Sequence, residues 1–275
     1  MQDGQFFDMM LEIWLDKRQV KALTSSDYIA VFDSGVGGIS VLRHLRQRMP
    51  GEQYLYFGDC ANAPYGSRST EDVRHLTLAA VEAIFSAYPV KALVVACNTA
   101  TAAAIAILRK QYPQQIIIGI EPALKLAADK FPGGRIGVMA TEVTLREEKF
   151  DSLLHRFDAD CAVQKIPAPG LVELIEQGKT DTPETEQLLA ALLQPYKGKL
   201  DALVLGCTHY PFAAEAIRRV LGDDVLLLDG GEGTARETER RLSAAGLLRT
   251  ASCGSVTWMA SGNETAFAEL AATLL

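Results

Sequence analysis

Short, continuously apolar runs alternate along the chain with longer stretches in which apolar residues recur every three or four positions. The runs at 29–32, 92–97 and 116–120 have the composition of strands that are buried on both faces. The stretch at 39–49 instead places its apolar residues on one face of a helix. This alternation predicts an α/β fold of parallel sheets, each covered by helices on both faces.

The second half of the chain repeats the strand pattern of the first. Three apolar runs of the first half have counterparts in the second. The run that starts at 29 matches one that starts at 136, and the run that ends at 97 matches one that ends at 207. The run that starts at 116 matches one that starts at 225. The offsets are 107, 110 and 109 positions, which unrelated coincidences would rarely produce. Helical patterns accompany the runs at 100–108, 150–157 and 212–221. The sequence therefore predicts two pseudo-symmetric, doubly wound lobes with an active site between them.

The last apolar run, Ser255–Ala260, follows the second lobe together with one more helical stretch. We expect this segment to return to the first lobe. The first domain would then be discontinuous, made of residues 28–122 and 233–275, with residues 123–232 as the second domain. Residues 1–27 have no counterpart in the repeat and are interpreted as an N-terminal extension, either a short docked helix or a frayed tail.

Composition narrows the class of protein. The chain has 275 residues, 48% of them hydrophobic, and a mean hydropathy of +0.08, which fits well-buried globular domains. The net charge of −7 and the pI near 5.2 argue against a nucleic-acid partner. No run approaches 18 apolar residues, and the N-terminus lacks a signal-peptide pattern. We therefore expect neither a membrane span nor a membrane partner.

The five cysteines favour a reducing cytoplasm, because their number is odd and no pair has CxxC spacing. Cys97 and Cys207 end matching strands, and each precedes small polar residues and a helix start. A helix N-terminus lowers the pKa of a thiol from about 8.5, so we expect both thiols to be reactive. The other three, Cys60, Cys161 and Cys253, lack this setting and are interpreted as packing residues.

In parallel α/β sheets the functional site lies beyond the carboxyl ends of the strands. Five polar residues fall there: Asp33, Ser34, Cys97, Thr141 and Cys207. The glycines that follow Ser34 allow backbone N–H groups to approach a small anion such as a carboxylate. A dinucleotide fingerprint would need a third glycine where this chain has Ser40. The loop at 63–66 is suited to closing over a substrate.

Two thiols that face each other across a pocket can invert a stereocentre. One thiolate removes a proton from carbon, and the other thiol delivers a proton to the opposite face. Hydrogen-bond donors that could hold a substrate carboxylate are Ser34, Asn98, Thr99 and Thr208. A Cys207–His209 hydrolase dyad is an alternative, although a hydrolase needs only one nucleophile. An amino-acid-binding protein would explain the donors but not the paired thiols.

Four segments together resemble the glutamate racemases of bacterial cell-wall synthesis: Phe32–Gly38, Pro64–Gly66, Ala96–Thr99 and Gly206–His209. The resemblance runs from about Tyr28 to the C-terminus. It implies cofactor-independent interconversion of L- and D-glutamate for peptidoglycan synthesis, without pyridoxal phosphate or metal, in a cytoplasmic homodimer. Aspartate racemases share the two-thiol plan and are the alternative within the family.

The same resemblance implies roles for individual residues. Cys97 and Cys207 would be the acid/base pair, Cys97 serving the D-enantiomer and Cys207 the L-enantiomer. Asp33 would assist Cys97, His209 would assist Cys207, and Glu176 would be a further assisting carboxylate. A solvated helix face is the alternative for Glu176.

The resemblance also implies a set of substrate contacts. Its members are Asp33, Ser34, Tyr65, Gly66, Asn98, Thr99, Thr141, Thr208 and His209, with Thr144 as an addition. An N-cap is the alternative for Thr144.

Overall fold

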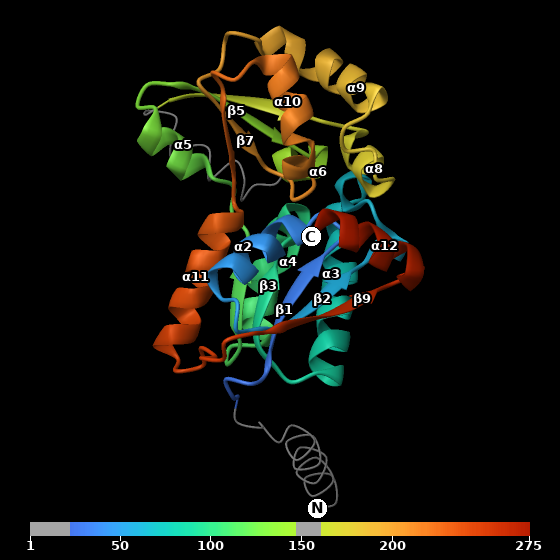
Figure 1. Cartoon of the computed structure of the whole chain (residues 1–275), viewed down its shortest axis with the longest axis vertical. Coiled ribbons are helices and arrows are strands. Elements are labelled where there is room, and N and C mark those ends of the chain that lie inside the picture. The colour runs from blue at the N-terminus through green and yellow to red at the C-terminus, as the bar shows by residue number, and fades with distance from the viewer. Residues whose placement is uncertain (1–22, 147–160) are drawn as a thin grey trace, which may run out of the picture.

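Figure 1 shows the computed structural model, which describes residues 23–146 and 161–275 and places them around two separate parallel sheets. The first sheet has the strand order β4-β3-β1-β2-β9, and every neighbouring pair in it is parallel. Its strands are β1 (Tyr28–Asp33), β2 (Gln53–Gly58), β3 (Val90–Val95), β4 (Ile116–Gly119) and β9 (Ser255–Ala260). The last strand of the chain thus lies beside β2 at the edge of the first sheet.

The second sheet is also parallel and has the order β6-β5-β7-β8. Its strands are β5 (Arg135–Ala140), β6 (Ala162–Pro167), β7 (Ala202–Leu205) and β8 (Leu226–Asp229). The strands matched by the sequence repeat occupy equivalent places, because β4-β3-β1-β2 in one sheet corresponds to β8-β7-β5-β6 in the other. The predicted pair of pseudo-symmetric α/β lobes is therefore confirmed.

Helices cover both faces of each sheet. Those on the first sheet are α2 (Ile39–Arg48), α3 (Thr70–Ala87), α4 (Asn98–Gln111), α11 (Gly231–Ala244) and α12 (Glu264–Leu274). Those on the second are α5 (Leu124–Lys130), α6 (Glu142–Arg146), α8 (Leu171–Glu176), α9 (Pro183–Leu193) and α10 (Ala214–Leu221). No helix in the described part of the chain is both long and apolar enough to cross a bilayer.

Continuous apolar strands are required because each sheet has a core on both faces. Successive side chains of a strand point to opposite sides. In β1, Ile29 and Val31 pack with α2, α11 and α12, whereas Ala30 and Phe32 pack with α3 and α4. All four side chains are fully buried. This arrangement explains why the strands show no alternation of apolar and polar residues.

The helices predicted at 39–49 and 100–108 are confirmed as α2 and α4. The stretch at 212–221 is helical too, with a 3₁₀ turn at Tyr210–Ala213 leading into α10. The pattern at 150–157 and residues 1–22 of the N-terminal extension lie outside the described residues.

The interpretation of three cysteines as packing residues is confirmed for two of them. Cys161 is buried in the core of the second sheet, and Cys60 is half-buried against the first. The prediction is wrong for Cys253, which is exposed. This residue lies in the irregular segment between α11 and β9, where its Sγ is 3.5 Å from the Gly254 carbonyl.

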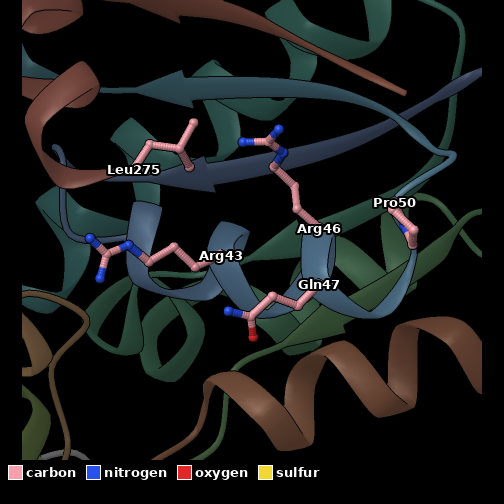
Figure 2. A pocket seen from close by; sticks show the side chains of 5 residues that line it. All are labelled: Arg43, Arg46, Gln47, Pro50 and Leu275. Carbon is pink, nitrogen blue, oxygen red and sulfur yellow. The ribbon is translucent and has the colours of Figure 1, made fainter. Parts of the chain in front are cut away.

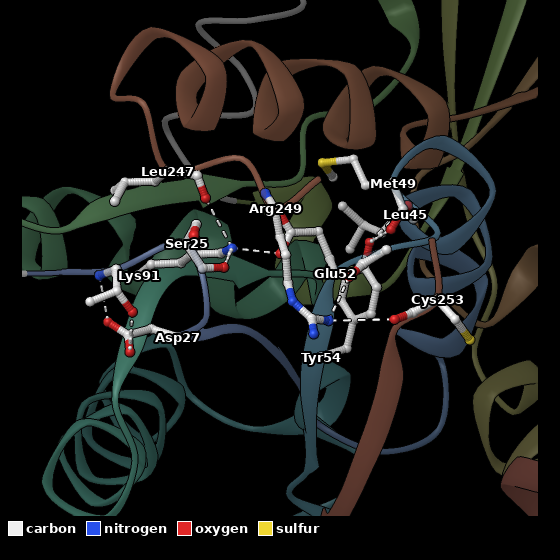
Figure 3. A network of polar contacts seen from close by, with 12 residues as sticks. Ser25, Asp27, Leu45, Met49, Glu52, Tyr54, Lys91, Leu247, Arg249 and Cys253 are labelled. Atoms are coloured by element: carbon white, nitrogen blue, oxygen red, sulfur yellow. Dashed lines mark hydrogen bonds and ion pairs between the residues drawn. The ribbon is translucent and has the colours of Figure 1, made fainter. Parts of the chain in front are cut away.

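A buried ion pair joins chain segments at the amino ends of the first-sheet strands (Figure 3). Lys91 Nζ donates to Glu52 Oε2 (2.5 Å), to Ser25 O (2.6 Å) and to Leu247 O (3.0 Å). Glu52 Oε1 accepts from the Arg249 N–H (2.9 Å). Both charged side chains are fully buried. All three ammonium donors of Lys91 and both carboxylate oxygens of Glu52 nevertheless have partners. The pair thus ties the segment after α11 to β2 and β3.

We expect Lys91→Met to lower the free energy of unfolding by about 3–5 kcal/mol, because it leaves the Glu52 carboxylate buried without its cation. Urea unfolding at pH 7, followed by circular dichroism, measures this loss. The double variant Lys91→Met/Glu52→Gln should recover part of it, since the amide carries no charge. A loss below about 1 kcal/mol in the single variant would show that the pair contributes little.

Candidate active site

Hydrogen bonds connect the carboxyl ends of the two sheets. Thr208 Oγ1, which follows β7, donates to Asp33 Oδ2 at the end of β1 (3.0 Å). The Val36 N–H, in the glycine-rich loop after β1, donates to Glu176 Oε1 at the end of α8 (3.0 Å). These contacts join residues that lie 175 and 140 positions apart. Asp33, Thr208 and Glu176 are therefore brought together between the lobes.

Cys97 follows β3 and is the N-cap of α4. Its Sγ accepts the Ala100 N–H at 3.4 Å and lies 3.5 Å from Ser34 Oγ. The side chain is 4% exposed. The thiol is thus held between the glycine-rich loop and the first turn of α4, as its position in the sequence predicted.

The expectation that a helix start lowers the pKa of the Cys97 thiol is wrong. Burial raises this pKa to about 12, and the negative charge of Asp33 raises it as well. The Ala100 N–H and the Ser34 hydroxyl act in the opposite direction, but they are outweighed. Loss of hydration penalises a thiolate more than two hydrogen bonds stabilise it. Cys97 is therefore a neutral thiol at pH 7.

Asp33 ends β1 and is fully buried. Its Oδ1 accepts the Gly35 N–H at 2.9 Å, and its Oδ2 accepts the Thr208 hydroxyl. Burial raises the pKa of the carboxyl, and attraction by His209 and these hydrogen bonds offset only part of that rise. Asp33 is thus a carboxyl group whose affinity for a proton is raised, and it lies within electrostatic range of Cys97.

Cys207, His209 and Glu176 form a chain of contacts on the other side of the site. Cys207 Sγ lies 3.7 Å from His209 Nδ1, and His209 Nε2 lies 2.5 Å from Glu176 Oε1. Cys207 and His209 are 8% and 2% exposed. The alternative that Glu176 lies on a solvated helix face does not fit this geometry.

His209 and Glu176 each stabilise the charged form of the other. Burial acts to lower the pKa of His209, but the contacts with Cys207 and Glu176 outweigh it and raise the pKa well above its ordinary value. Burial likewise acts to raise the pKa of Glu176, but the bond and charge of His209, with the Val36 N–H, lower it. The pair therefore consists of an imidazolium and a carboxylate.

Three threonine hydroxyls form a cluster where the end of β5 meets α4. Thr99 Oγ1 lies 3.2 Å from both Thr141 Oγ1 and Thr144 Oγ1, and the latter two are 3.0 Å apart. Thr141 Oγ1 also accepts the Thr144 N–H at 3.3 Å. Thr141 is thus the residue that caps the first turn of α6, and the N-cap alternative for Thr144 is wrong.

Asn98 offers an unused acceptor at the site. Its side chain is 93% buried, and within residues 23–146 and 161–275 its Oδ1 has no hydrogen-bond partner. Buried polar atoms are nearly always paired in folded proteins, so an orphaned acceptor beside Cys97 indicates a place for a donor from a ligand. An ammonium group is such a donor. Across the described residues, no group of three or more His, Cys, Asp or Glu side chains could hold a metal ion.

The structure places Tyr65 and Gly66 in a loop that contacts the second lobe. Tyr65 is buried, and its hydroxyl donates to Asp59 Oδ2 at 2.5 Å. A Cβ atom at Gly66 would collide with the Thr141 side chain, so the close contact between the loop and β5 requires glycine there. Gly37 has the same role in the loop after β1, because His209 and Thr208 lie against it.

Asp59 is not among the site residues that the sequence predicts. The structure shows that it organises the Tyr65 loop, since it also accepts from Asn62 Nδ2 (3.0 Å) and Ser261 Oγ (2.6 Å). Its position directly after β2, at the same sheet edge as Asp33, was the available signal. The expected anion cradle after β1 also exists in part, because the Val36 N–H binds a carboxylate, that of Glu176.

Two surface cavities lie away from the thiols. One, of about 440 Å³, is lined by Arg43, Arg46, Gln47, Pro50 and Leu275 along the outer side of α2 (Figure 2). Another, of about 940 Å³, is bordered by the ends of β4 and β8 and by the start of α11. Neither is lined by Cys97 or Cys207.

Comparisons with known proteins agree with this geometry. The family model described as Asp/Glu/Hydantoin racemase matches residues 38–238. Glutamate racemase from Clostridium botulinum is 45% identical over 249 residues, which cover 90% of this chain and 96% of that protein. The crystal structure of glutamate racemase isoform RacE1 from Bacillus anthracis superposes with a TM-score of 0.81 at 34% identity, covering 90% of this chain and 93% of that one.

A structure of Escherichia coli glutamate racemase in complex with L-glutamate and the activator UDP-MurNAc-ala is 31% identical, with a TM-score of 0.80 over 90% of this chain and 94% of that one. The sequence match extends over most of the chain, and the structural match includes both lobes. This chain belongs to the Asp/Glu/Hydantoin racemase family.

Proposed function

We propose that this protein interconverts L- and D-glutamate by a two-base mechanism in which Cys97 and Cys207 act on opposite faces of the α-carbon. The observation that carries the proposal is the placement of two buried thiols at equivalent strand ends of two facing sheets, each with its own acid/base partner. Relatives named glutamate racemase, at 45% and 34% identity, support glutamate as the substrate.

In the L-to-D direction, Cys207 removes the α-proton. The His209 imidazolium lies 3.7 Å from its sulfur and offsets the negative charge when Cys207 is a thiolate. Glu176 holds the imidazole ring in place through Nε2 and balances its charge. This is the arrangement of a positioned general base whose partner is in turn oriented by a third group.

Cys97 then delivers a proton to the opposite face. Its raised pKa keeps it a neutral thiol at pH 7, which is the form that donates. In the D-to-L direction Cys97 must first lose its proton, and Asp33 is the neighbouring carboxyl group whose raised pKa suits it to accept one. The ammonium group of a bound amino acid adds a positive charge that favours the resulting thiolate.

Polar groups around the thiols hold the amino acid. The unpaired Asn98 Oδ1 is an acceptor for the ammonium group. The remaining proposed contacts are Asp33, Ser34, Tyr65, Gly66, Thr99, Thr141, Thr208 and His209. Since both thiols are buried, the contacts between the lobes must separate to admit substrate and then close again. Closure excludes water, which strengthens the interactions that stabilise the carbanion.

The proposal is tested by incubating the purified protein with L-glutamate and no added cofactor, and by measuring both enantiomers by chiral chromatography. We expect D-glutamate to accumulate until the two forms are equal. L-aspartate should have a kcat/KM lower by about 10- to 200-fold, because a side chain one methylene shorter fills the pocket poorly. Absence of D-glutamate would contradict the proposal, and equal rates for the two amino acids would favour the aspartate racemase alternative.

The same proposal includes the biological setting that the sequence resemblance implies. D-glutamate would supply peptidoglycan synthesis, and the enzyme would work as a homodimer in the cytoplasm. The proposal also includes two domains, the first made of residues 28–122 and 233–275 and the second of residues 123–232. It is supported by β9, which joins the first sheet although it follows the second in the chain.

A further inference from the structure

Ser40, at the start of α2, links the two lobes. Its Oγ lies 2.8 Å from two carbonyl oxygens, those of Gly37 and Thr208, and the residue is 7% exposed. A bond to a carbonyl three residues earlier is ordinary for a serine in the first turn of a helix. The bond to Thr208 is different, because that residue is 168 positions away and belongs to the other lobe. Local helix geometry does not account for this second contact.

Thr208 is the residue between Cys207 and His209. The segment that contains it is a turn between β7 and the 3₁₀ helix that leads into α10, so no ladder of helix or strand hydrogen bonds holds it. Its hydroxyl donates to Asp33, and its carbonyl accepts from Ser40. No other donor within residues 23–146 and 161–275 bonds this carbonyl. A buried carbonyl that loses its donor is costly, so Ser40 constrains the turn.

We propose that Ser40 is a positioning residue for the Cys207 side of the site. The inference rests on the proposed function and goes beyond it: Ser40 contacts no reacting atom and acts through the Thr208 backbone. By holding the 207–209 turn against the loop after β1, it sets the distance from the Cys207 sulfur to the α-carbon. A misplacement of about 1 Å can slow a reaction about 10²-fold.

Comparing kcat/KM in the two reaction directions cannot show whether a variant slows the step at Cys207 or the step at Cys97. L- and D-glutamate have the same free energy, so the equilibrium constant is one and kcat/KM must be equal in both directions for every variant. The primary isotope effect on kcat/KM does distinguish the two sides. Deuterium on the α-carbon of L-glutamate reports the step at Cys207, and deuterium on D-glutamate reports the step at Cys97. A slower Cys207 step raises the first effect and lowers the second.

The experiment compares wild-type protein with Ser40→Ala, using both α-deuterated enantiomers. We expect kcat/KM to fall by about 10- to 100-fold, with a larger isotope effect from L-glutamate and a smaller one from D-glutamate. Ser40→Thr, which keeps the hydroxyl, should recover most of the rate. Thr238→Val is the matched control, because it removes a buried hydroxyl that donates to Thr234 O within α11. For Thr238→Val, kcat/KM should stay within about twofold of wild type, and both isotope effects should be unchanged.

Amide hydrogen exchange gives a readout that needs no turnover. In Ser40→Ala the peptide containing 206–212 should exchange several-fold faster than in wild-type protein or in Thr238→Val. If Ser40→Ala does not fold by circular dichroism, Ser40→Cys is measured instead, because it nearly preserves the side-chain volume and replaces the hydroxyl with a weak donor. Unchanged exchange, a rate within twofold of wild type, or isotope effects that do not move would overturn the proposal. A larger isotope effect from D-glutamate and a smaller one from L-glutamate would place the defect at the Cys97 step and so contradict the proposal. If the wild-type protein does not racemise glutamate but the 206–212 peptide still exchanges faster in Ser40→Ala than in wild type, the proposed function is contradicted and the positioning role remains supported.

Discussion

Cys97→Ala and Cys207→Ala should each lower kcat for glutamate racemisation by at least about 10³-fold. Each thiol serves one face of the α-carbon, so the remaining one cannot both remove and deliver the proton on opposite faces. A positioned acid or base contributes about 10²- to 10⁴-fold, and each variant loses the base of one direction and the acid of the other. Chiral chromatography of both reaction directions measures the loss.

The matched control is Cys161→Ala. Cys161 is also buried, at 7% exposed, but it packs in the core of the second sheet. The kcat of Cys161→Ala for glutamate racemisation should stay within about twofold of wild type. All three variants should keep the wild-type circular dichroism spectrum. If either active-site variant retained a near-wild-type rate, the two-base mechanism would be wrong, and a hydrolase dyad or a packing role would need to be reconsidered.

In heavy water, nearly all D-glutamate formed from L-glutamate should carry deuterium on its α-carbon, whereas the remaining L-glutamate should stay unlabelled at early times. Cys207 takes protium from the substrate on one face. Cys97, which has equilibrated with solvent before binding, delivers deuterium to the other face. Return of the carbanion to L-glutamate uses the protium still held on Cys207. The low exposure of both cysteine residues, 4% and 8%, keeps solvent from exchanging that proton within one turnover.

Mass spectrometry of each enantiomer at low conversion measures the label, and a reaction started from D-glutamate is the control. There the pattern should reverse, with labelled L-glutamate as product and unlabelled D-glutamate remaining. A single base serving both faces would carry the substrate's own proton into the product. Substantial protium in the product would therefore rule out separate bases for the two faces.

The parallel architecture and the location of the site could be predicted from the sequence because both depend on local patterns. Apolar runs without alternation require burial on both faces, and Ile29, Ala30, Val31 and Phe32 show that burial in β1. In parallel sheets all carboxyl ends meet at one edge, so the end of β1 and the residue after β3 had to lie near each other. The repeat then predicted the equivalent position of Cys207.

The electrostatics of the site could not be predicted in this way. The helix start after Cys97 favoured a lowered pKa, yet burial and Asp33 raise it to about 12. Desolvation and charge act through space, so they depend on which distant segments cover a group. The Glu176–His209 pair is a similar case, because its members lie 33 positions apart and both are largely buried only in the folded protein.

The sequence by itself thus determined the fold class, the strand-end positions of the two thiols and the family, since each is encoded in short segments or in their spacing. Only the tertiary structure decided the charge states of Cys97 and His209, the partner of Glu176 and the bond from Ser40 to Thr208. These features arise where two lobes meet. Packing between segments 33 to 168 positions apart sets burial and hydrogen-bond partners there, and no local pattern along the chain records it.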